Sequence, residues 1–455
     1  MTDKTMPMGA AGAPPRTVPL PAGAPKPMSQ AAQLAANPKP GAEPPAELYP
    51  LPPEEEDEGY RVHRELKVGE RMNFQHHPLA LKDRHLRQHA LLSGRPNGGI
   101  ELLTESLLAQ QTRHGRGWVY FDTTGNYLLR DRLAALAQAE GRGDEFLVLA
   151  PYTHRNSFRY DVFRYGNIEQ RALRALQALP AKRKDPHGAF VRAQALKILR
   201  HVLGKALDAR VTLNSLVDWL SGLTGEELLE NLVLPAVAVA NDVAKAKSET
   251  LLLGVKDELI QAYTKLDMDS FDKFLTAENP ETSFQDVLSH NKMCYVMLPF
   301  TGADANAKLL RVARMMLLDF LDAMPVRAAI PRRLRAPLLA VLANAPAYAM
   351  PLSDLVQPIL DNHSFDRAFR YDVSLMPTTN NWSKLRHVDE LLWLNWLPKM
   401  YTRIEFAVEN DPTWFYGSAD FHISMNNGDE NCYGYLAREF MLPAAAQYER
   451  PVPDF

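Results

Sequence analysis

Two glycines, Gly94 and Gly99, mark the place in this chain where residue types and spacing first suggest chemistry. An apolar run over 90–92 precedes them and a helical pattern follows them. A second apolar run over 118–121 then ends in Asp122. Strand, glycine-rich loop, helix and strand, in this order, form the setting that a phosphate-binding loop requires. The two glycines hold the glycine positions of the motif G-x-x-x-x-G-K-[ST].

The next two positions of that motif should be a lysine and a hydroxyl residue, but this chain has Ile100 and Glu101. In a working phosphate loop the lysine neutralises the β- and γ-phosphates, and the hydroxyl holds Mg²⁺. Isoleucine offers neither a charge nor a donor. Glu101 places a negative charge near the helix N-terminus, where a phosphate would otherwise bind. The pattern predicts a P-loop fold that has lost its hydrolytic chemistry.

A second motif is altered in the same way. Ring-forming RecA-like P-loop ATPases need an apolar strand that ends in Asp-Glu, because the Asp orders Mg²⁺ and the Glu polarises the attacking water. The apolar run over 338–342 is followed here by Ala343 and Asn344. We therefore expect no catalytic residue and no bound cofactor, with binding of ATP and Mg²⁺ weak or absent.

Composition is that of an ordinary soluble globular protein, with 46% apolar and 23% charged residues in 455. A net charge of −3 gives no global attraction to nucleic acid. Cys294 and Cys432 are too few for a disulfide framework, which favours a reducing cytoplasm. Apolar stretches stay well below the roughly 18–20 residues that cross a bilayer, so we expect no transmembrane segment.

Residues 1–58 contain 14 of the 34 prolines and end in an acidic run over 54–58, which predicts a disordered tail. Strands and helices alternate over 59–166 and again over 291–442, as in one parallel α/β domain. Residues 167–290 carry helical patterns without clear strand signals, which indicates an all-α insertion domain. Residues 443–455 are expected to form a C-terminal tail.

Individual elements follow from the same periodicities. Expected strands lie at 61–68, 90–92, 118–121, 146–150, 293–298 and 337–342. Expected helices lie at 127–140, 169–179, 190–207, 213–220, 226–232, 236–247, 250–266 and 305–323.

Four short motifs occur in order along the chain. They are RGWVYFDTTGN at 116–126, GRGDE at 141–145, MLP at 297–299 and ENDPTW at 409–414. Their order, over roughly 60–440, resembles the coupling-protein ATPases of type IV secretion and conjugation (the TraG/TraD group). The resemblance is closest to the branch of the IncI-plasmid and Dot/Icm systems. It implies a RecA-like P-loop sheet with an all-α insertion.

Asp122 and Gly125 match positions of that family's motifs, whereas Thr124 stands where the family has lysine. The family's N-terminal membrane helices are also missing. Because Ile100, Glu101, Ala343 and Asn344 depart from the catalytic pattern, the resemblance carries over the fold and a place in a secretion machine, not an activity.

The expectation is therefore a catalytically inactive subunit with a structural or recruiting role. It would act with other type IV secretion or conjugation proteins, including an active coupling ATPase, as a homo- or hetero-oligomer. It would be cytoplasmic, reaching the inner membrane through partners. Two alternatives stay open: a nucleotide-binding subunit of a mixed ring that is active only with partner residues, and a DNA-binding accessory module.

For three further groups of residues we favour a structural interpretation over a functional one. The first group precedes the altered loop and consists of His76, His77, His85 and His89. The same segment has no cysteine and no suitably spaced acid to complete a metal site, which favours surface or loop histidines. For the basic residues at 82, 84, 87 and 182–184 a DNA contact is the less favoured interpretation, and 182–184 favour a solvated turn. Trp382, Trp393, Trp396 and Trp414 favour core packing over a partner surface.

Overall fold

The computed structural model describes most of the chain between residues 66 and 448. The described residues are 66–71, 78–94, 99–151, 156–180, 186–206, 209–232, 242–268, 271–299, 303–347, 349, 359–379, 390, 394, 396–406, 420–425, 430–436, 442–443 and 445–448. The predicted tail at 1–58 lies outside them.

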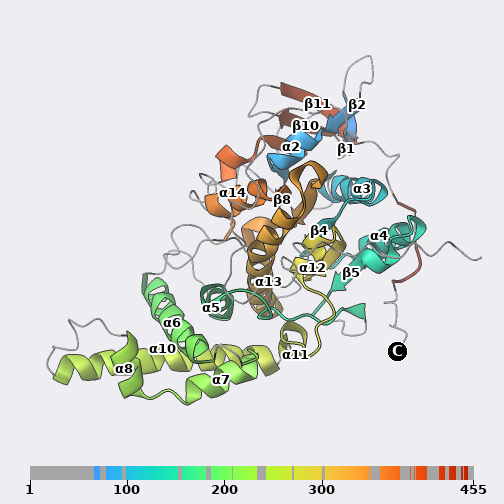
Figure 1. Ribbon diagram of the computed structural model, residues 1–455. Helices are drawn as coiled ribbons and strands as arrows, with labels where there is room; N and C mark the ends of the chain where they lie inside the picture. Colours follow the sequence, from blue (N-terminus) through green and yellow to red (C-terminus); the bar gives the residue numbers. More distant parts are fainter. Residues whose placement is uncertain are drawn as a thin grey trace, which may run out of the picture.

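A parallel sheet forms the centre of the molecule (Figure 1). Its strands run in the order β9-β3-β8-β7-β4-β6-β5, and all neighbours are parallel. They are β3 (Ala90–Ser93), β4 (Trp118–Asp122), β5 (Phe146–Leu149), β6 (Met293–Met297), β7 (Leu338–Leu342), β8 (Val373–Thr379) and β9 (Thr402–Phe406). Most of them are apolar and buried throughout, as expected for strands covered on both faces. The predicted parallel α/β fold is confirmed.

An antiparallel extension continues the sheet beyond β9; the strand predicted at 61–68 overlaps its β1, but the sequence does not predict the antiparallel pairing. Its strands follow in the order β10 (Asp420–Met425), β11 (Glu430–Leu436), β1 (Leu66–Arg71) and β2 (Pro78–Leu81). Strand β10 pairs with β9, and β1 pairs with β11, so the two ends of the described chain share one sheet. Antiparallel strands at the edge of a parallel sheet are common.

Helices cover both faces of the parallel strands. Alternate residues of β4 show the two layers, because successive strand side chains point to opposite faces. Trp118 and Tyr120 pack with α3 (Gly99–Arg113) and α4 (Tyr127–Ala139). Val119 and Phe121 pack with α12 (Phe284–Ser289), α13 (Ala303–Ala323) and α14 (Asn362–Arg370). Shorter helices are α2 (Asp83–Arg87), η1 (Gly143–Glu145), η3 (Met324–Ala329), η4 (Arg332–Leu334), η5 (Ala345–Ala347) and η6 (Leu397–Lys399).

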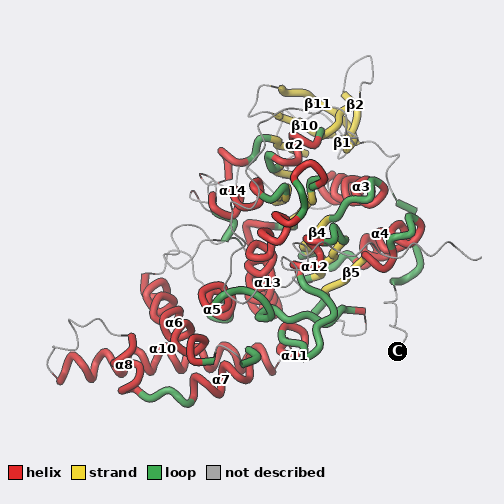
Figure 2. The backbone as a smooth tube through the Cα atoms, viewed as in Figure 1, coloured by secondary structure: helices red, strands yellow, loops and turns green. Residues whose placement is uncertain are grey.

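Between residues 167 and 290 every element that the structure describes is a helix. They are α5 (Ile168–Leu176), α6 (Pro186–Lys205), α7 (Leu213–Ser221), α8 (Gly225–Leu232), α10 (Asp242–Met268), α11 (Phe271–Leu275) and α12. Figures 1 and 2 show α6, α7, α8 and α10 projecting from the sheet as a helical arm. Helix α10 is continuous where the sequence predicts two helices, because Ser248 and Glu249 between them do not interrupt a helix. Residues 236–241 lie outside the described residues.

A buried ion-pair network ties α5, at the base of the arm, to α13 beneath the sheet. Arg174 Nη1 lies 2.7 Å from Asp319 Oδ1, and Arg174 Nη2 lies 3.0 Å from Asp322 Oδ2. The hydroxyl of Tyr160 donates to Asp319 at 2.5 Å. Because both carboxylates are paired and hydrogen-bonded, the buried guanidinium is accommodated.

None of the described helices combines the length and the apolar character needed to cross a bilayer.

Candidate functional site

The two sequence motifs meet at one edge of the sheet. Strand β8 separates β3, which leads to the glycine loop, from β7, which leads to the second motif. The amide of Gly94 donates to the carbonyl of Thr379 at 3.1 Å. The amide of Asn344 donates to Thr378 Oγ1 at 3.1 Å. Both motifs therefore lie at the carboxyl edge of the parallel sheet, on two strands that only β8 separates, and α/β proteins bind ligands at this edge.

The strand-to-helix corner at the glycines is present. Strand β3 ends at Ser93 and α3 begins at Gly99, while residues 95–98 lie outside the described part of the chain. A Cβ atom added to Gly99 would lie 2.0 Å from Phe406 Cε1, and one added to Gly94 would lie 2.8 Å from Phe406 Cβ. Glycine is required at both positions because Phe406 packs against the backbone there.

Ile100 and Glu101 lie in the first turn of α3, where the motif's lysine and hydroxyl would be. Ile100 is only 7% exposed and belongs to a hydrophobic cluster with Leu103, Ile404 and Phe406. Glu101 is half-buried, and its charge is favourable near the positive end of the helix dipole. The position of the motif's lysine is thus a core position in this fold.

The second motif ends in a turn without carboxylates. Ala343 continues the pairing with β4, since its amide donates to the carbonyl of Phe121 at 3.0 Å. Asn344 has φ of 50°, a left-handed conformation that asparagine tolerates. Mg²⁺ is normally held by carboxylate oxygens together with phosphate. Positions 100, 343 and 344 offer no carboxylate, and Glu101 lies at the helix N-terminus where the phosphate itself would bind, so these side chains do not fit a Mg²⁺–nucleotide site of the usual kind.

Asp122, at the end of β4, is a carboxylate at this same edge, and its oxygens are already occupied. They accept from the amide and hydroxyl of Thr124 at 2.8 and 2.6 Å, and from the amide of Asn126 at 2.7 Å. The hydroxyl of Tyr295 lies 2.8 Å from Asp122 Oδ2. Burial and the nearby negative charge of Asp122 raise the pKa of Tyr295, which keeps its proton available for this bond. Asp122 organises the turn before α4.

Gly125 lies in that turn and has φ of 72°. A Cβ there would come within 2.7 Å of Pro299 Cβ, so both conformation and space require glycine. The matched positions Asp122 and Gly125 therefore have structural reasons for their residue types, independent of any ligand.

Sequence reasoning missed two features of this edge. Thr378 and Thr379 end β8 between the two motif strands, and both are buried. A polar pair after an apolar strand was a usable signal. Phe406, in contrast, lies far along the chain from the loop that it contacts, and its sequence surroundings gave no signal.

The preference for surface or loop histidines is wrong for His85, which is buried in α2, whereas His89 lies in the loop between α2 and β3 but is buried. His89 Nδ1 accepts from the amide of Leu375 at 3.1 Å, and Nε2 lies 2.9 Å from the carbonyl of Phe365. Burial lowers the pKa of His89 to about 4, so the ring is neutral. His76 and His77 lie outside the described residues, among which no group of three or more candidate ligands could hold a metal ion.

The remaining groups are partly described. Trp396 is a core residue, as predicted, and its indole donates to the carbonyl of Leu360 at 2.8 Å. Arg87 pairs with Asp372 at 3.1 Å and Lys82 is exposed. Trp382, Trp393, Trp414 and residues 182–184 lie outside the described residues, as does the side chain at position 84.

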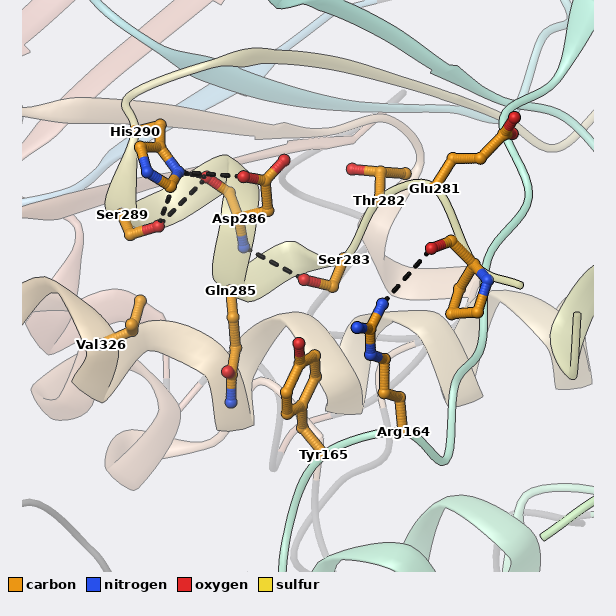
Figure 3. Close-up of a pocket in the computed structure, with 11 residues that line it drawn as sticks. Arg164, Tyr165, Glu281, Thr282, Ser283, Gln285, Asp286, Ser289, His290 and Val326 are labelled. Carbon is orange, nitrogen blue, oxygen red and sulfur yellow. Dashed lines mark hydrogen bonds and ion pairs between the residues drawn. The ribbon is translucent and has the colours of Figure 1, made fainter. Parts of the chain in front are cut away.

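A separate polar cavity of about 310 Å³ lies between the loop at 164–165 and the segment 280–290 (Figure 3). Arg164 reaches across one side and donates to the carbonyl of Pro280 at 3.3 Å. On the other side Asp286 pairs with His290 at 2.9 Å. These groups satisfy one another, and none lies at the edge that carries Gly94 and Asn344.

Comparisons with known proteins bear on the fold. No family model and no curated protein sequence matches the chain. Among solved structures, the bacterial conjugative coupling protein TrwB in its unbound form aligns with a TM-score of 0.58 at 11% identity, covering 82% of this chain and 88% of that one. TrwB with a non-hydrolysable GTP analogue aligns with a TM-score of 0.58 at 12% identity, covering 86% and 98%.

VirB4 of Thermoanaerobacter pseudethanolicus aligns with a TM-score of 0.50 at 11% identity, covering 83% of this chain and 98% of that one. At these identities the likeness shows the fold and not an activity. The predicted RecA-like fold, similar to that of the coupling-protein ATPases, is confirmed at that level.

Proposed function

We propose that this chain is a catalytically inactive P-loop-fold component of a type IV secretion or conjugative transfer system. It acts as a structural or recruiting subunit beside an active coupling ATPase. The shared fold with TrwB supports the setting. The loss of the lysine, hydroxyl and carboxylates from the two motif positions supports the inactivity.

The observation that carries the inactivity is the burial of Ile100. A motif lysine acts by presenting an ammonium to phosphates. Here the side chain at that position is 7% exposed and packs among apolar neighbours. The residue at the lysine position of the motif is therefore part of the hydrophobic core. This is more than a surface substitution, for which a neighbouring lysine could compensate.

We further propose that residues 59–166 and 291–442 form the α/β domain and that 167–290 form a helical domain. Segments 1–58 and 443–455 flank them. The projecting helices α6, α7, α8 and α10 are suited to contact partners, because they extend away from the sheet (Figure 1). The protein would work on the cytoplasmic side of the membrane.

The test is nucleotide binding and turnover by the purified full-length chain. Fluorescent ATP and GTP analogues are titrated with and without Mg²⁺, and phosphate release is followed at saturating nucleotide. A coupling ATPase with intact motifs serves as the positive control. We expect no saturable Mg²⁺-dependent binding and no turnover. Measurable turnover would overturn the proposal.

The mixed-ring alternative has one observation in its favour: Thr378 and Thr379 keep polar groups at the carboxyl edge. A partner could then complete a site there. It predicts that nucleotide binding appears only when this chain is mixed with an active coupling ATPase, and that the stoichiometry exceeds one nucleotide per ATPase subunit. A stoichiometry of one per ATPase subunit would reject it.

A further inference from the structure

The opposite edge of the sheet carries a concentration of arginines. Residues 327–335, which lead into β7, contain four arginines and no carboxylate. Helix α14 ends at Arg370, just before β8, and α2 ends at Arg87, just before β3. These residues precede three neighbouring parallel strands, so they lie at the amino edge, whereas the motif positions lie at the carboxyl edge.

Contacts show that these segments form one surface. Arg335 Nη1 lies 3.5 Å from the carbonyl of Arg370 and 3.5 Å from Asp372 Oδ2. Arg87 Nε lies 3.1 Å from Asp372 Oδ1. Arg327 Nε donates to the carbonyl of Tyr371 at 2.9 Å, which holds the same loop. We call the surface formed by Arg87, Arg332, Arg333, Arg335 and Arg370 the arginine face.

The local charge of the arginine face is positive, whereas the net charge of the whole chain is negative. Five arginines against the single carboxylate of Asp372 give a local charge of +4. Since the whole chain has a net charge of −3, all other residues sum to −3 − 4 = −7. The exposed Asp366 on α14 does not cancel this charge, because it pairs with Lys399 at 2.5 Å.

Three members of the arginine face are available for an external ligand. Arg332, Arg333 and Arg370 are exposed, and their side chains make no ion pair with another residue of the described ranges. Leu334, which follows Arg333, is 68% exposed, and Phe369, which precedes Arg370, is 50% exposed. Basic and apolar side chains thus alternate on this surface.

We propose that the arginine face binds the surface of an anionic phospholipid bilayer. Arginines would contact lipid phosphates, and Leu334 and Phe369 would enter the boundary between head groups and acyl chains. A nucleic acid could use the same arginines through its phosphates, but the phosphate backbone that such arginines contact offers the aliphatic side chain of Leu334 no apolar surface, unlike the acyl chains of a bilayer. The sheet would then stand with its amino edge on the membrane, and its carboxyl edge would lie about 17 Å further away, the length of a short strand.

The proposal is independent of catalytic inactivity and is tested by vesicle co-sedimentation of the full-length chain. Vesicles of phosphatidylglycerol and phosphatidylethanolamine are compared with vesicles of phosphatidylcholine. We expect binding to the anionic vesicles that weakens with salt. The triple variant Arg332→Ala/Arg333→Ala/Arg370→Ala should bind about 100-fold more weakly, at about 1 kcal/mol for each basic residue and 1.4 kcal/mol for each tenfold.

Two variants distinguish the effect of the arginine face from an effect of the overall charge of the protein. Lys245→Ala/Lys247→Ala/Lys265→Ala removes three exposed charges from α10 and should bind within about threefold of the natural chain, since these residues lie on the helical arm. Leu334→Ser keeps every charge and should weaken binding about tenfold, by removing apolar insertion. Circular dichroism confirms that each variant is folded.

Three results would overturn the proposal. The first is no binding to anionic vesicles at low salt. The second is equal loss of binding in the α10 control and in the arginine variant. The third is binding of a DNA duplex or single strand that the arginine variant abolishes, together with vesicle binding that the variant leaves unchanged.

Discussion

Phe406 on β9 lies against the backbone of Gly99, the residue at which α3 begins. A Cβ on Gly99 would lie within 2.1 Å of two ring atoms of Phe406. Ile100 belongs to the same hydrophobic cluster as Phe406. The glycine at the start of α3, the residue at the lysine position of the motif and strand β9 are therefore packed together. This packing connects the glycine spacing of the sequence to the hydrophobic core.

The substitution Gly99→Ala should destabilise the fold, because the added methyl group meets the buried ring of Phe406. Overpacking of this kind costs about 1–3 kcal/mol. The measurement is the free energy of unfolding from urea titration of the full-length chain.

Gly204→Ala is the matched control. Gly204 lies in α6, and a Cβ there would meet no atom within 4 Å. At this penultimate position of α6 alanine meets no clash and restricts the unfolded chain more than glycine does, so this variant should gain about 0.4–1 kcal/mol. If both variants changed stability in the same direction, close packing at Gly99 would not be the cause.

Ile100→Lys, which restores the motif's lysine, should destabilise the protein and should not restore nucleotide binding. Ile100 is buried among apolar side chains, and an unpaired ammonium there is strongly disfavoured. We expect a loss of about 2 kcal/mol or more. Leu102→Lys, one position beyond Glu101 and 37% exposed, is the control and should be tolerated. Mg²⁺-dependent nucleotide binding by the Ile100 variant would contradict this account.

The sequence predicted the strand-to-helix corner because its signals are local. The apolar run of β3, the glycines and the helical pattern of α3 lie within one short stretch, and β7 is likewise a contiguous apolar run. Periodicity and turn chemistry are properties of neighbours in sequence, so such elements can be identified without tertiary information.

The features that the sequence does not predict depend on contacts between residues far apart in the chain. His89 is buried because its ring bridges Phe365 and Leu375, which lie 276 and 286 residues away. Phe406 meets Gly99 across neighbouring strands in the same way. The order of strands in a sheet determines such contacts, and no local pattern encodes them.

Asp122→Asn should destabilise the turn before α4. The carboxylate accepts from three donors within the turn and faces the hydroxyl of Tyr295. An amide nitrogen in place of one oxygen would face a donor, which costs about 2 kcal/mol. The exposed Asp144→Asn is the control and should leave the urea midpoint unchanged. Equal midpoints for the two variants would refute a turn-organising role for Asp122.

His89 should make the stability depend on pH. Its pKa is about 4 in the folded chain and 6.5 in the unfolded chain, so the unfolded state binds more protons between these values. Stability from His89 is therefore fully present above pH 6.5, falls as the pH decreases, and is reduced by about 3 kcal/mol below pH 4.

Two buried carboxyl groups act in the opposite direction. Burial raises the pKa values of Asp161 and Asp319 to about 6, so these groups favour the folded state at low pH and lose that contribution as the pH rises. The dependence on His89 must therefore be isolated by comparing the natural chain with His89→Gln, which can keep one donor and one acceptor. The difference in unfolding free energy between the two chains should change by about 3 kcal/mol from pH 7 to pH 4. A difference that stays constant over this range would mean that His89 does not titrate on unfolding.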